Sequence, residues 1–150
     1  MRAVVQRVLE ASVRVVASDG SSEQVGAIGP GLCVLVGVTH DDGEPQAAKL
    51  AERLWGLRIF DGVDGGPERS VADVSGALLV VSQFTLYGET TRGRRPSWSA
   101  AARPEHAAPL VESVVDRLRE VGATVATGVF RSDMQVALVN DGPFTVIVEV

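Results

Sequence analysis

The sequence predicts an α+β domain in which strands dominate and two main helices lie on one side. Valine-rich segments that alternate with polar residues stand at both ends of the chain, which is typical of half-buried strands. Two internal segments instead carry apolar residues at helical spacing. This arrangement favours two packed, largely antiparallel sheets or a partly closed barrel. The chain has 150 residues, of which 45% are hydrophobic, so we expect a single domain over residues 1–150 with a sizeable core.

The first half of the chain alternates between strands and turns before its first helix. Residues 3–8, 12–17 and 25–28 predict strands, with turns at 19–22 and 29–31. Residues 32–38 form a nearly continuous apolar run, which indicates a strand covered on both faces. Pro45 suits the first turn of a helix. The apolar face of that helix comprises Ala47, Leu50, Ala51, Leu54 and Leu57.

The second half returns to strands around one more helix. Residues 58–60 predict a short strand, 61–69 a glycine-rich loop, 77–82 a buried strand and 88–99 a long polar loop. A helix is expected over residues 104–121, either starting or kinked at Pro109. Its buried face comprises Leu110, Val111, Val114, Leu118 and Val121. Residues 124–129, 134–139 and 145–150 predict the closing strands.

Charge and composition narrow the class of partner. The net charge of −5 argues against a general affinity for nucleic acid. The polar loop nevertheless holds Arg92, Arg94 and Arg95 within four residues, which makes it either a solvated loop or a clamp for phosphate. Cys33 is interpreted as a small buried residue in a reducing compartment. With no apolar signal segment and no run as long as a membrane span, we expect a cytoplasmic protein without a membrane partner.

The inventory of catalytic groups is sparse. The two histidines stand next to no serine or cysteine motif, and no metal-ligand spacing, Walker loop or G-x-S-x-G motif is present, so we predict no metal and no cofactor. Thr85 is either an ordinary strand residue or a nucleophile that lacks a nearby base. Backbone N–H groups at a strand end that stabilise an ester oxyanion are the alternative.

One segment before the C-terminus, Asn-Asp-Gly-Pro-Phe-Thr at residues 140–145, has two interpretations. It lies between two apolar runs, so a hairpin turn is the ordinary interpretation. A Gly-Pro step cannot simply continue a strand, because proline lacks an N–H group and fixes its own φ. A second segment, Ser-Gln-Phe-Thr-Leu at residues 82–86, favours a functional interpretation instead.

These two segments together resemble the paired signatures of the D-aminoacyl-tRNA deacylase family. The likeness extends to the N-terminal Met-Arg-Ala-Val-Val-Gln-Arg, to Gly-Leu-Cys-Val-Leu-Val-Gly at residues 31–37, to Leu-Arg-Ile-Phe at 57–60 and to Arg-Gly-Arg-Arg-Pro-Ser at 92–97. The chain is identified as a member of this family from the order of all these motifs. The resemblance implies a homodimeric hydrolase that releases D-amino acids from tRNA, and glycine from glycyl-tRNA mischarged on tRNA(Ala).

The resemblance also assigns roles to residues of this chain. A cis Gly-Pro step would project into the partner's pocket and read chirality by its backbone, which is proofreading in translation. The implied catalytic residues are Gln83, Phe84 and Thr85, and those that bind the substrate are Ser82, Gly142, Pro143, Phe130 and Met134. The implied orienting residues are Arg7, Asn140 and Thr145, and those that bind tRNA are Arg92, Arg94 and Arg95.

Two residues depart from the family pattern, and two alternative functions stay open. Phe144 stands where valine is usual, and Arg131 lies in a segment that is usually Phe-Gly-Ala-X-Met. One alternative is a nucleic-acid-binding module without catalysis, built on the arginine loop. The other is a related deacylase that acts on L-alanyl-tRNA and carries a trans Gly-Pro step.

Overall fold

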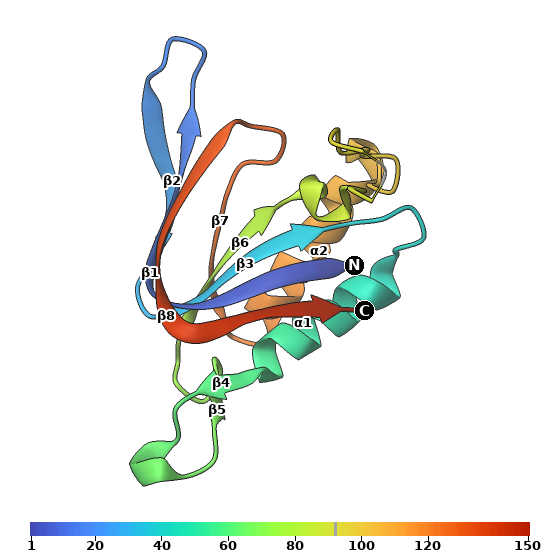
Figure 1. The fold of residues 1–150 in the computed structure, drawn as a ribbon. Helices are drawn as coiled ribbons and strands as arrows, with labels where there is room; N and C mark the ends of the chain where they lie inside the picture. The colour runs from blue at the N-terminus through green and yellow to red at the C-terminus, as the bar shows by residue number, and fades with distance from the viewer. Residues whose placement is uncertain (92) are drawn as a thin grey trace.

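The computed structural model describes residues 1–91 and 93–150. A mixed six-stranded sheet runs in the order β2 (Ser22–Ile28), β1 (Arg2–Val16), β3 (Gly31–Gly37), β6 (Ala77–Ser82) and β7 (Thr124–Thr127), with β8 (Met134–Glu149) paired to β1. The two parallel pairs are β3–β6 and β6–β7, and the other pairs are antiparallel. The long strands β1 and β8 bend together, so the sheet curls into a partly closed barrel (Figure 1). The predicted α+β class is therefore confirmed.

Two helices cover one side of this curled sheet (Figure 1). They are α1 (Glu44–Gly56) and α2 (Pro104–Glu120), and α2 runs through Pro109 without starting there. A two-stranded sheet of β4 (Arg58–Phe60) and β5 (Arg69–Ser70) follows α1. Two short 3₁₀ turns, η1 (Val63–Gly65) and η2 (Phe84–Tyr87), complete the described elements.

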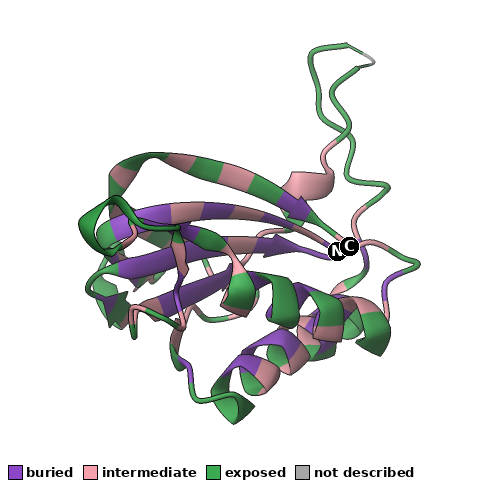
Figure 2. Cartoon of the chain, turned by 90° about the horizontal axis from the view of Figure 1, so that it is seen from below, coloured by how far each residue is buried: buried purple, intermediate pink, exposed green. Residues whose placement is uncertain are grey.

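The core divides into two layers because the central strands are covered on both faces. Val34 and Val80 face the helices, whereas Cys33 and Leu79, their neighbours in sequence, face the inside of the curl. Figure 2 shows the buried residues concentrated on the strands, with exposed residues along the outer sides of the helices. The continuous apolar run at residues 32–38 thus has the double cover that its sequence predicts. Burial raises the pKa of Cys33 to about 11, which keeps the thiol protonated and unreactive.

Two pairs of strands that the sequence predicts as separate are each continuous in the structure. The strands predicted at residues 3–8 and 12–17 form one strand, β1, which bends at register shifts instead of breaking. The strands predicted at 134–139 and 145–150 likewise form one strand, β8. The hairpin turn considered for residues 140–145 is therefore wrong, because the chain passes through this segment without reversing its direction. A bulge absorbs the Gly-Pro step, which removes the need for a turn.

Candidate active site

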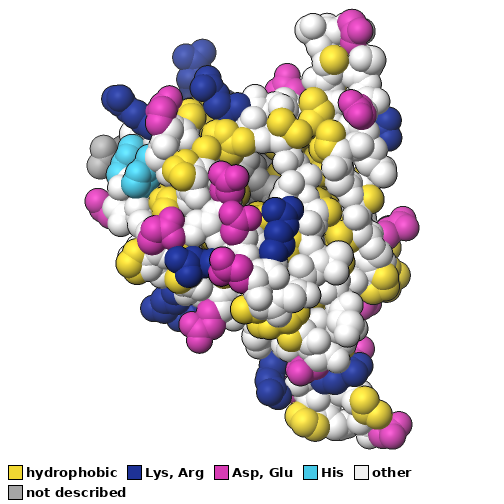
Figure 3. Space-filling model, turned by 180° about the vertical axis from the view of Figure 1, so that it is seen from behind, with side chains coloured by type: hydrophobic (Ala, Val, Ile, Leu, Met, Phe, Trp, Pro, Cys, Tyr) yellow, Lys and Arg dark blue, Asp and Glu magenta, His cyan; other side chains and the backbone are white. Residues whose placement is uncertain are grey.

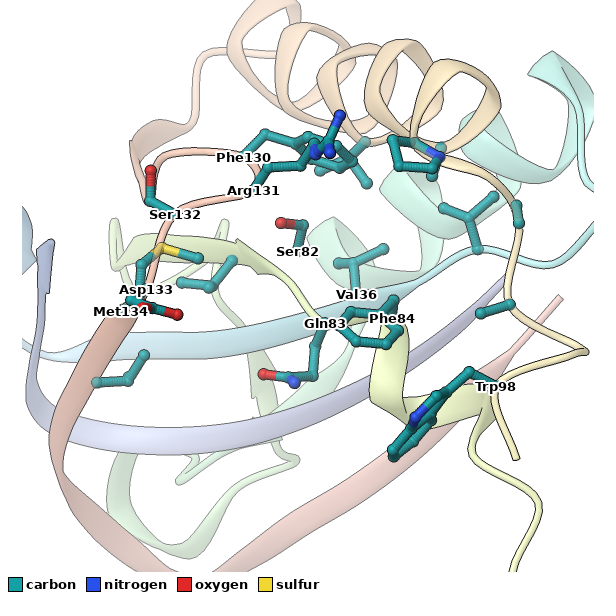
Figure 4. A pocket seen from close by; sticks show the side chains of 18 residues that line it. Val36, Ser82, Gln83, Phe84, Trp98, Phe130, Arg131, Ser132, Asp133 and Met134 are labelled. Carbon is teal, nitrogen blue, oxygen red and sulfur yellow. The ribbon is translucent and has the colours of Figure 1, made fainter. Parts of the chain in front are cut away.

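A pocket of about 570 Å³ opens where β3 and β6 end, next to the first turns of α2 (Figure 4). This volume lies within the usual range for sites that bind small molecules. Its lining comes from β3, β6, η2, α2 and the turn between β7 and β8. Ser82, Gln83, Phe84, Phe130 and Met134 all line it. The fold thus brings together these residues selected from sequence, although they come from two segments that are far apart in the chain.

The floor of the pocket is the junction between β6 and η2. Ser82 pairs with Val36 as the last residue of β6, and the N–H of Gln83 donates to the Val36 carbonyl at 2.7 Å. The chain then turns sharply into η2. Gly37 permits this close packing, because a Cβ there would lie 3.1 Å from atoms of Gln83, Leu86 and Tyr87. Thr85 therefore lies in a 3₁₀ turn and not in a strand, which corrects one of its two sequence interpretations.

The first turn of η2 has two backbone N–H groups next to the pocket, which Phe84 lines and Thr85 does not. The N–H groups of the first helical residues, here Phe84 and Thr85, have no acceptor within their own turn. Gln83 precedes them without making a capping hydrogen bond from its side chain. Two adjacent N–H groups therefore have no acceptor within η2, and an oxyanion hole requires donors of this kind.

The hydroxyl group of Thr85 has an amide neighbour and not a base. The carboxamide of Gln83 donates a hydrogen bond to Thr85 Oγ1. A carboxamide cannot accept the proton of a hydroxyl group at neutral pH, so it orients Thr85 without activating it. His40 and His106 bond instead to the carbonyls of Ser99 and Asp42, each at 2.8 Å.

The opposite wall of the pocket is the turn between β7 and β8. Phe130 and Met134 line it as the resemblance implies, and Gly128 makes room for Met134, since a Cβ there would lie 2.6 Å from its sulfur atom. Arg131 takes a positive φ of 63°, a conformation that residues other than glycine rarely adopt. It lines the same pocket together with Asp133, so a cation and a carboxylate stand on one wall. Neither belongs to the residues assigned from sequence.

The Gly-Pro segment lies away from this pocket. Gln6 pairs with Thr145 and Val8 pairs with Asn140, so residues 141–144 bulge out of β8 opposite a single residue, Arg7. The peptide bond between Gly142 and Pro143 is cis. Both residues are exposed.

The distance between the two motifs follows from the strand register. Arg7 pairs with Leu32 near the start of β3, whereas the pocket begins at Val36. These positions are about 13 Å apart at ~3.3 Å per residue. Within one chain, the two signatures therefore form separate sites.

The side chain of Arg7 holds the bulge by hydrogen bonds to its backbone carbonyls. The residue is 5% exposed, and its Nε lies 3.2 Å from the Asp141 carbonyl and 2.8 Å from the Asp141 carboxylate. Nη2 donates to the Gly142 carbonyl at 3.3 Å. Nη1 donates to the Ile59 carbonyl at 2.8 Å and to the Asp61 carboxylate at 3.2 Å. The guanidinium group thus ties the bulge to the segment after α1.

Side chains at the two ends of the bulge, Asn140 and Thr145, hold those ends by hydrogen bonds. Asn140 Nδ2 donates to the carbonyls of Arg7 and Phe144 at 2.8 and 3.2 Å. Thr145 Oγ1 accepts a hydrogen bond from Gln6 Nε2 at 3.1 Å. The ring of Phe144 lies under the guanidinium carbon of Arg7, 4.5 Å from it. The extra bulk of Phe144 therefore packs toward Arg7 and the core, and not toward the exposed Gly-Pro step.

The arginine loop projects from the body of the molecule (Figure 2). Arg94 and Arg95 are exposed on it, and Arg92 lies outside the described residues. The loop is closed by two backbone hydrogen bonds between Glu89 and Ser97, of 2.8 and 3.0 Å. Figure 3 shows several basic side chains at this corner, and a mixture of acidic and basic side chains over the rest of that face.

Sequence reasoning missed Trp98, which lines the pocket beside Phe84. Its place at the end of the arginine loop was the signal that could have found it. Among the described residues, no cluster of three histidine, cysteine, aspartate or glutamate side chains has a geometry that would hold a metal ion. Within the same residues, no helix has both the length and the apolar character needed to cross a membrane.

Comparison with known families finds one profile over almost the whole chain. The family described as D-Tyr-tRNA(Tyr) deacylase matches residues 4–149. A protein of Streptomyces coelicolor described as a D-aminoacyl-tRNA deacylase is 60% identical over 151 residues, covering 100% of both chains. A protein of Thermus aquaticus with the same description is 53% identical over 149 residues, covering 99% of this chain and 95% of its own.

Solved structures agree with this fold. One described as c-Myc DNA Unwinding Element Binding Protein superposes with a TM-score of 0.90 at 37% identity, covering 100% of this chain and 99% of its own. Another, described as a probable eukaryotic D-amino acid tRNA deacylase, has a TM-score of 0.81 at 17% identity. It covers 99% of this chain and 98% of its own, and at that identity the likeness concerns the fold alone.

Proposed function

The chain belongs to the D-Tyr-tRNA(Tyr) deacylase family, and from that premise we propose that it proofreads chirality in translation by hydrolysing D-aminoacyl-tRNA through a Gly-Pro motif shared between two subunits. The chain is a hydrolase of the D-aminoacyl-tRNA deacylase type. The observation that carries the rest is the open first turn of η2 at the pocket, with two N–H groups beside Gln83.

The proposed chemistry is hydrolysis of an ester without a nucleophile from the protein. Water attacks the carbonyl carbon that links the amino acid to the ribose, and the carbonyl oxygen becomes an oxyanion. The N–H groups of Phe84 and Thr85 donate to that oxygen; one such donor is worth roughly 10²–10³ in rate. The ribose oxygen then leaves and takes up a proton, which gives free D-amino acid and tRNA. The neighbouring ribose hydroxyl orients the water, since Thr85 has no base.

A second copy of the chain completes the proposed site. Gly142 and Pro143 are exposed and lie roughly 13 Å along the sheet from the pocket of their own chain. In a two-fold dimer, each bulge would enter the partner's pocket, and the two sites would be equivalent. The partners are thus a second subunit and the aminoacyl-tRNA, and no cofactor takes part.

Selectivity would arise from the backbone of the bulge. Carbonyl oxygens of Gly142 and Pro143 would accept hydrogen bonds from the α-ammonium group and occupy the space that an L side chain needs. Glycine has no side chain to exclude, so glycyl-tRNA mischarged on tRNA(Ala) would also be cleaved. The proposed compartment is the cytoplasm, where a single free cysteine such as Cys33 is ordinary.

The remaining residues selected from sequence hold the substrate or the bulge. Phe130 and Met134 are assigned to the terminal adenosine, and Ser82 to the floor beneath the ester. Arg7, Asn140 and Thr145 orient the bulge through the hydrogen bonds that hold it. Arg92, Arg94 and Arg95 would contact tRNA phosphates.

The test is deacylation of D-tyrosyl-tRNA and L-tyrosyl-tRNA in parallel, with a chelator present. Rapid loss of the D ester alone is the expected result. Equal cleavage of both esters would contradict the role of the Gly-Pro backbone in selectivity.

A second candidate function is nucleic-acid binding without catalysis. It is favoured by the solved structure at 37% identity, which is described as a protein that binds a DNA unwinding element. Salt-sensitive tRNA binding with neither ester cleaved would support that function instead.

Thr85→Val is expected to retain most activity, because the hydroxyl group accepts a hydrogen bond from Gln83 and attacks nothing. Losing one hydrogen bond corresponds to a fall of at most about tenfold in kcat/KM. Single-turnover deacylation of D-tyrosyl-tRNA measures it, with Thr85→Ser as the control that keeps the hydroxyl. Loss of activity on the order of 10⁴ or more in the valine variant alone would identify Thr85 as the nucleophile.

A further inference from the structure

Two exposed aromatic side chains stand side by side at the mouth of the pocket. Phe84 is 56% exposed and Trp98 is 43% exposed, and both line the pocket (Figure 4). Their ring centroids are 5.5 Å apart and their planes meet at 70°, an edge-to-face contact. Large aromatic surfaces left in water next to a pocket need an explanation, because burial elsewhere would stabilise the fold.

The Trp98 ring packs directly against the backbone of Gly88. A Cβ on Gly88 would lie 2.5 Å from Cζ3 and 3.2 Å from Cε3 of Trp98, so the ring rests directly on the Gly88 backbone. The Trp98 carbonyl accepts a hydrogen bond from the Ala101 N–H at 3.0 Å, which fixes the chain beyond it. One side of the indole is therefore covered by backbone and its edge meets Phe84, while the remaining surface stays open.

The contact between Gly88 and Trp98 lies at the base of the arginine loop. Gly88 and Trp98 directly flank the Glu89–Ser97 bridge that closes the loop, and Arg94 and Arg95 project from it. A flat aromatic surface at the foot of a basic loop matches a single-stranded nucleic acid, whose bases stack while its phosphates meet arginine.

We propose that Trp98 and Phe84 form a stacking platform for the base of the nucleotide that precedes the terminal adenosine of the tRNA. The proposal rests on the proposed function, since that function puts the acylated adenosine in the adjoining pocket. The next nucleotide must then leave through the pocket mouth, where the platform stands. Trp98 would contribute to the binding of tRNA esters and not to the ester chemistry.

The kinetic test compares a long and a short substrate. With D-tyrosyl-tRNA, Trp98→Ala is expected to raise KM about tenfold with little change in kcat, as stacking of one base requires. With D-tyrosyl-adenosine, which lacks the preceding nucleotide, the same variant is expected to change KM less than about twofold. Trp98→Phe keeps a ring and is expected to restore most of the lost affinity. Equal losses with both substrates would overturn the proposal.

A binding measurement separates this inference from the proposed function. The chain has two tryptophans, so a Trp55→Phe background leaves Trp98 as the fluorescent reporter. The dinucleotide cytidylyl-adenosine, which has no ester to cleave, is expected to quench Trp98 more strongly than adenosine does. Gly88→Ala is expected to remove that difference, because its methyl group displaces the indole.

The outcomes are distinct. Quenching by the dinucleotide without any ester hydrolysis would contradict the proposed function and support the stacking platform. Hydrolysis of D-tyrosyl-tRNA without dinucleotide-specific quenching would support the proposed function and contradict the stacking platform. Dissociation of Trp98→Ala into monomers in sedimentation runs would assign the ring to contacts between two copies, and would overturn the proposal.

Discussion

Gly142→Ala is expected to lower deacylation of D-tyrosyl-tRNA at least about 100-fold while leaving the fold intact. Within its own chain, a Cβ at this glycine meets nothing within 4 Å, and its φ is not positive. The free energy of unfolding should therefore change by less than about 0.5 kcal/mol. In the proposed dimer, the added methyl group would occupy the partner's pocket where the substrate's α-carbon must fit.

Gly29→Ala is the matched control. It adds the same methyl group at another position that has open space, in the turn between β2 and β3. Urea unfolding and single-turnover deacylation should both match the unsubstituted protein. An equal loss of activity in both variants would show that the methyl group acts through something other than the Gly-Pro bulge.

Mixed dimers test whether the pocket and the bulge of one site come from different subunits. Phe84→Pro removes one oxyanion donor at the first position of η2, where proline is tolerated. A heterodimer of this variant with Gly142→Ala has one site with an intact pocket and an intact bulge. Random exchange of subunits should then restore about a quarter of the original activity. No recovery after exchange, with heterodimers present, would place the whole site within one chain.

Arg7→Ala is expected to cost about 3 kcal/mol in the free energy of unfolding and to lower activity by at least about 100-fold. The buried guanidinium group donates to the buried carbonyl of Ile59 and to the part-buried carbonyls of Asp141 and Gly142, and its removal leaves all three without this donor. The bulge would lose its link to the segment after α1. Asp61 is largely exposed, so its carboxylate returns to water at little cost.

Arg14→Ala serves as the control for this variant. Arg14 lies on the same strand, is exposed, and makes two hydrogen bonds to Ser22 of 3.0 Å each. Its removal should cost less than about 1 kcal/mol in urea unfolding and leave deacylation unchanged. If Arg7→Ala unfolds no more easily than Arg14→Ala, the network around Arg7 contributes nothing to the bulge.

Much of the fold follows from local patterns. The helix expected over residues 104–121 is observed as α2 over Pro104–Glu120, and its predicted buried residues Leu110, Val114 and Leu118 are in the core. The prediction that Val121 is buried is wrong, because the helix ends before it and its side chain is exposed. The strand boundaries around residues 9–11 and 140–144 do not follow from sequence. Leu9 and Glu10 interrupt the alternation that predicts a strand, yet pairing with β8 carries β1 through them.

The candidate site divides in the same way. The motif at residues 82–86 marks the floor of the pocket, and the motif at 140–145 marks the bulge, as two short stretches of sequence can do. The contacts of Arg7 are different, because Ile59 lies 52 residues away and the Gly142 carbonyl 135. The hydrogen-bond partners of Arg7 depend on where β1, β8 and the segment after α1 meet.

The sequence by itself determined the fold class, the double cover of the central strands, the family and five of the residues that line the pocket. These follow from side-chain period, turn chemistry and short motifs, which act between near neighbours in the chain. Only the tertiary structure decided that the two motifs lie apart, that Phe144 packs on Arg7, and that Trp98 rests on Gly88. Such contacts depend on strand register and on the closure of the curled sheet, and a shift of one residue in register would turn each side chain to the other face.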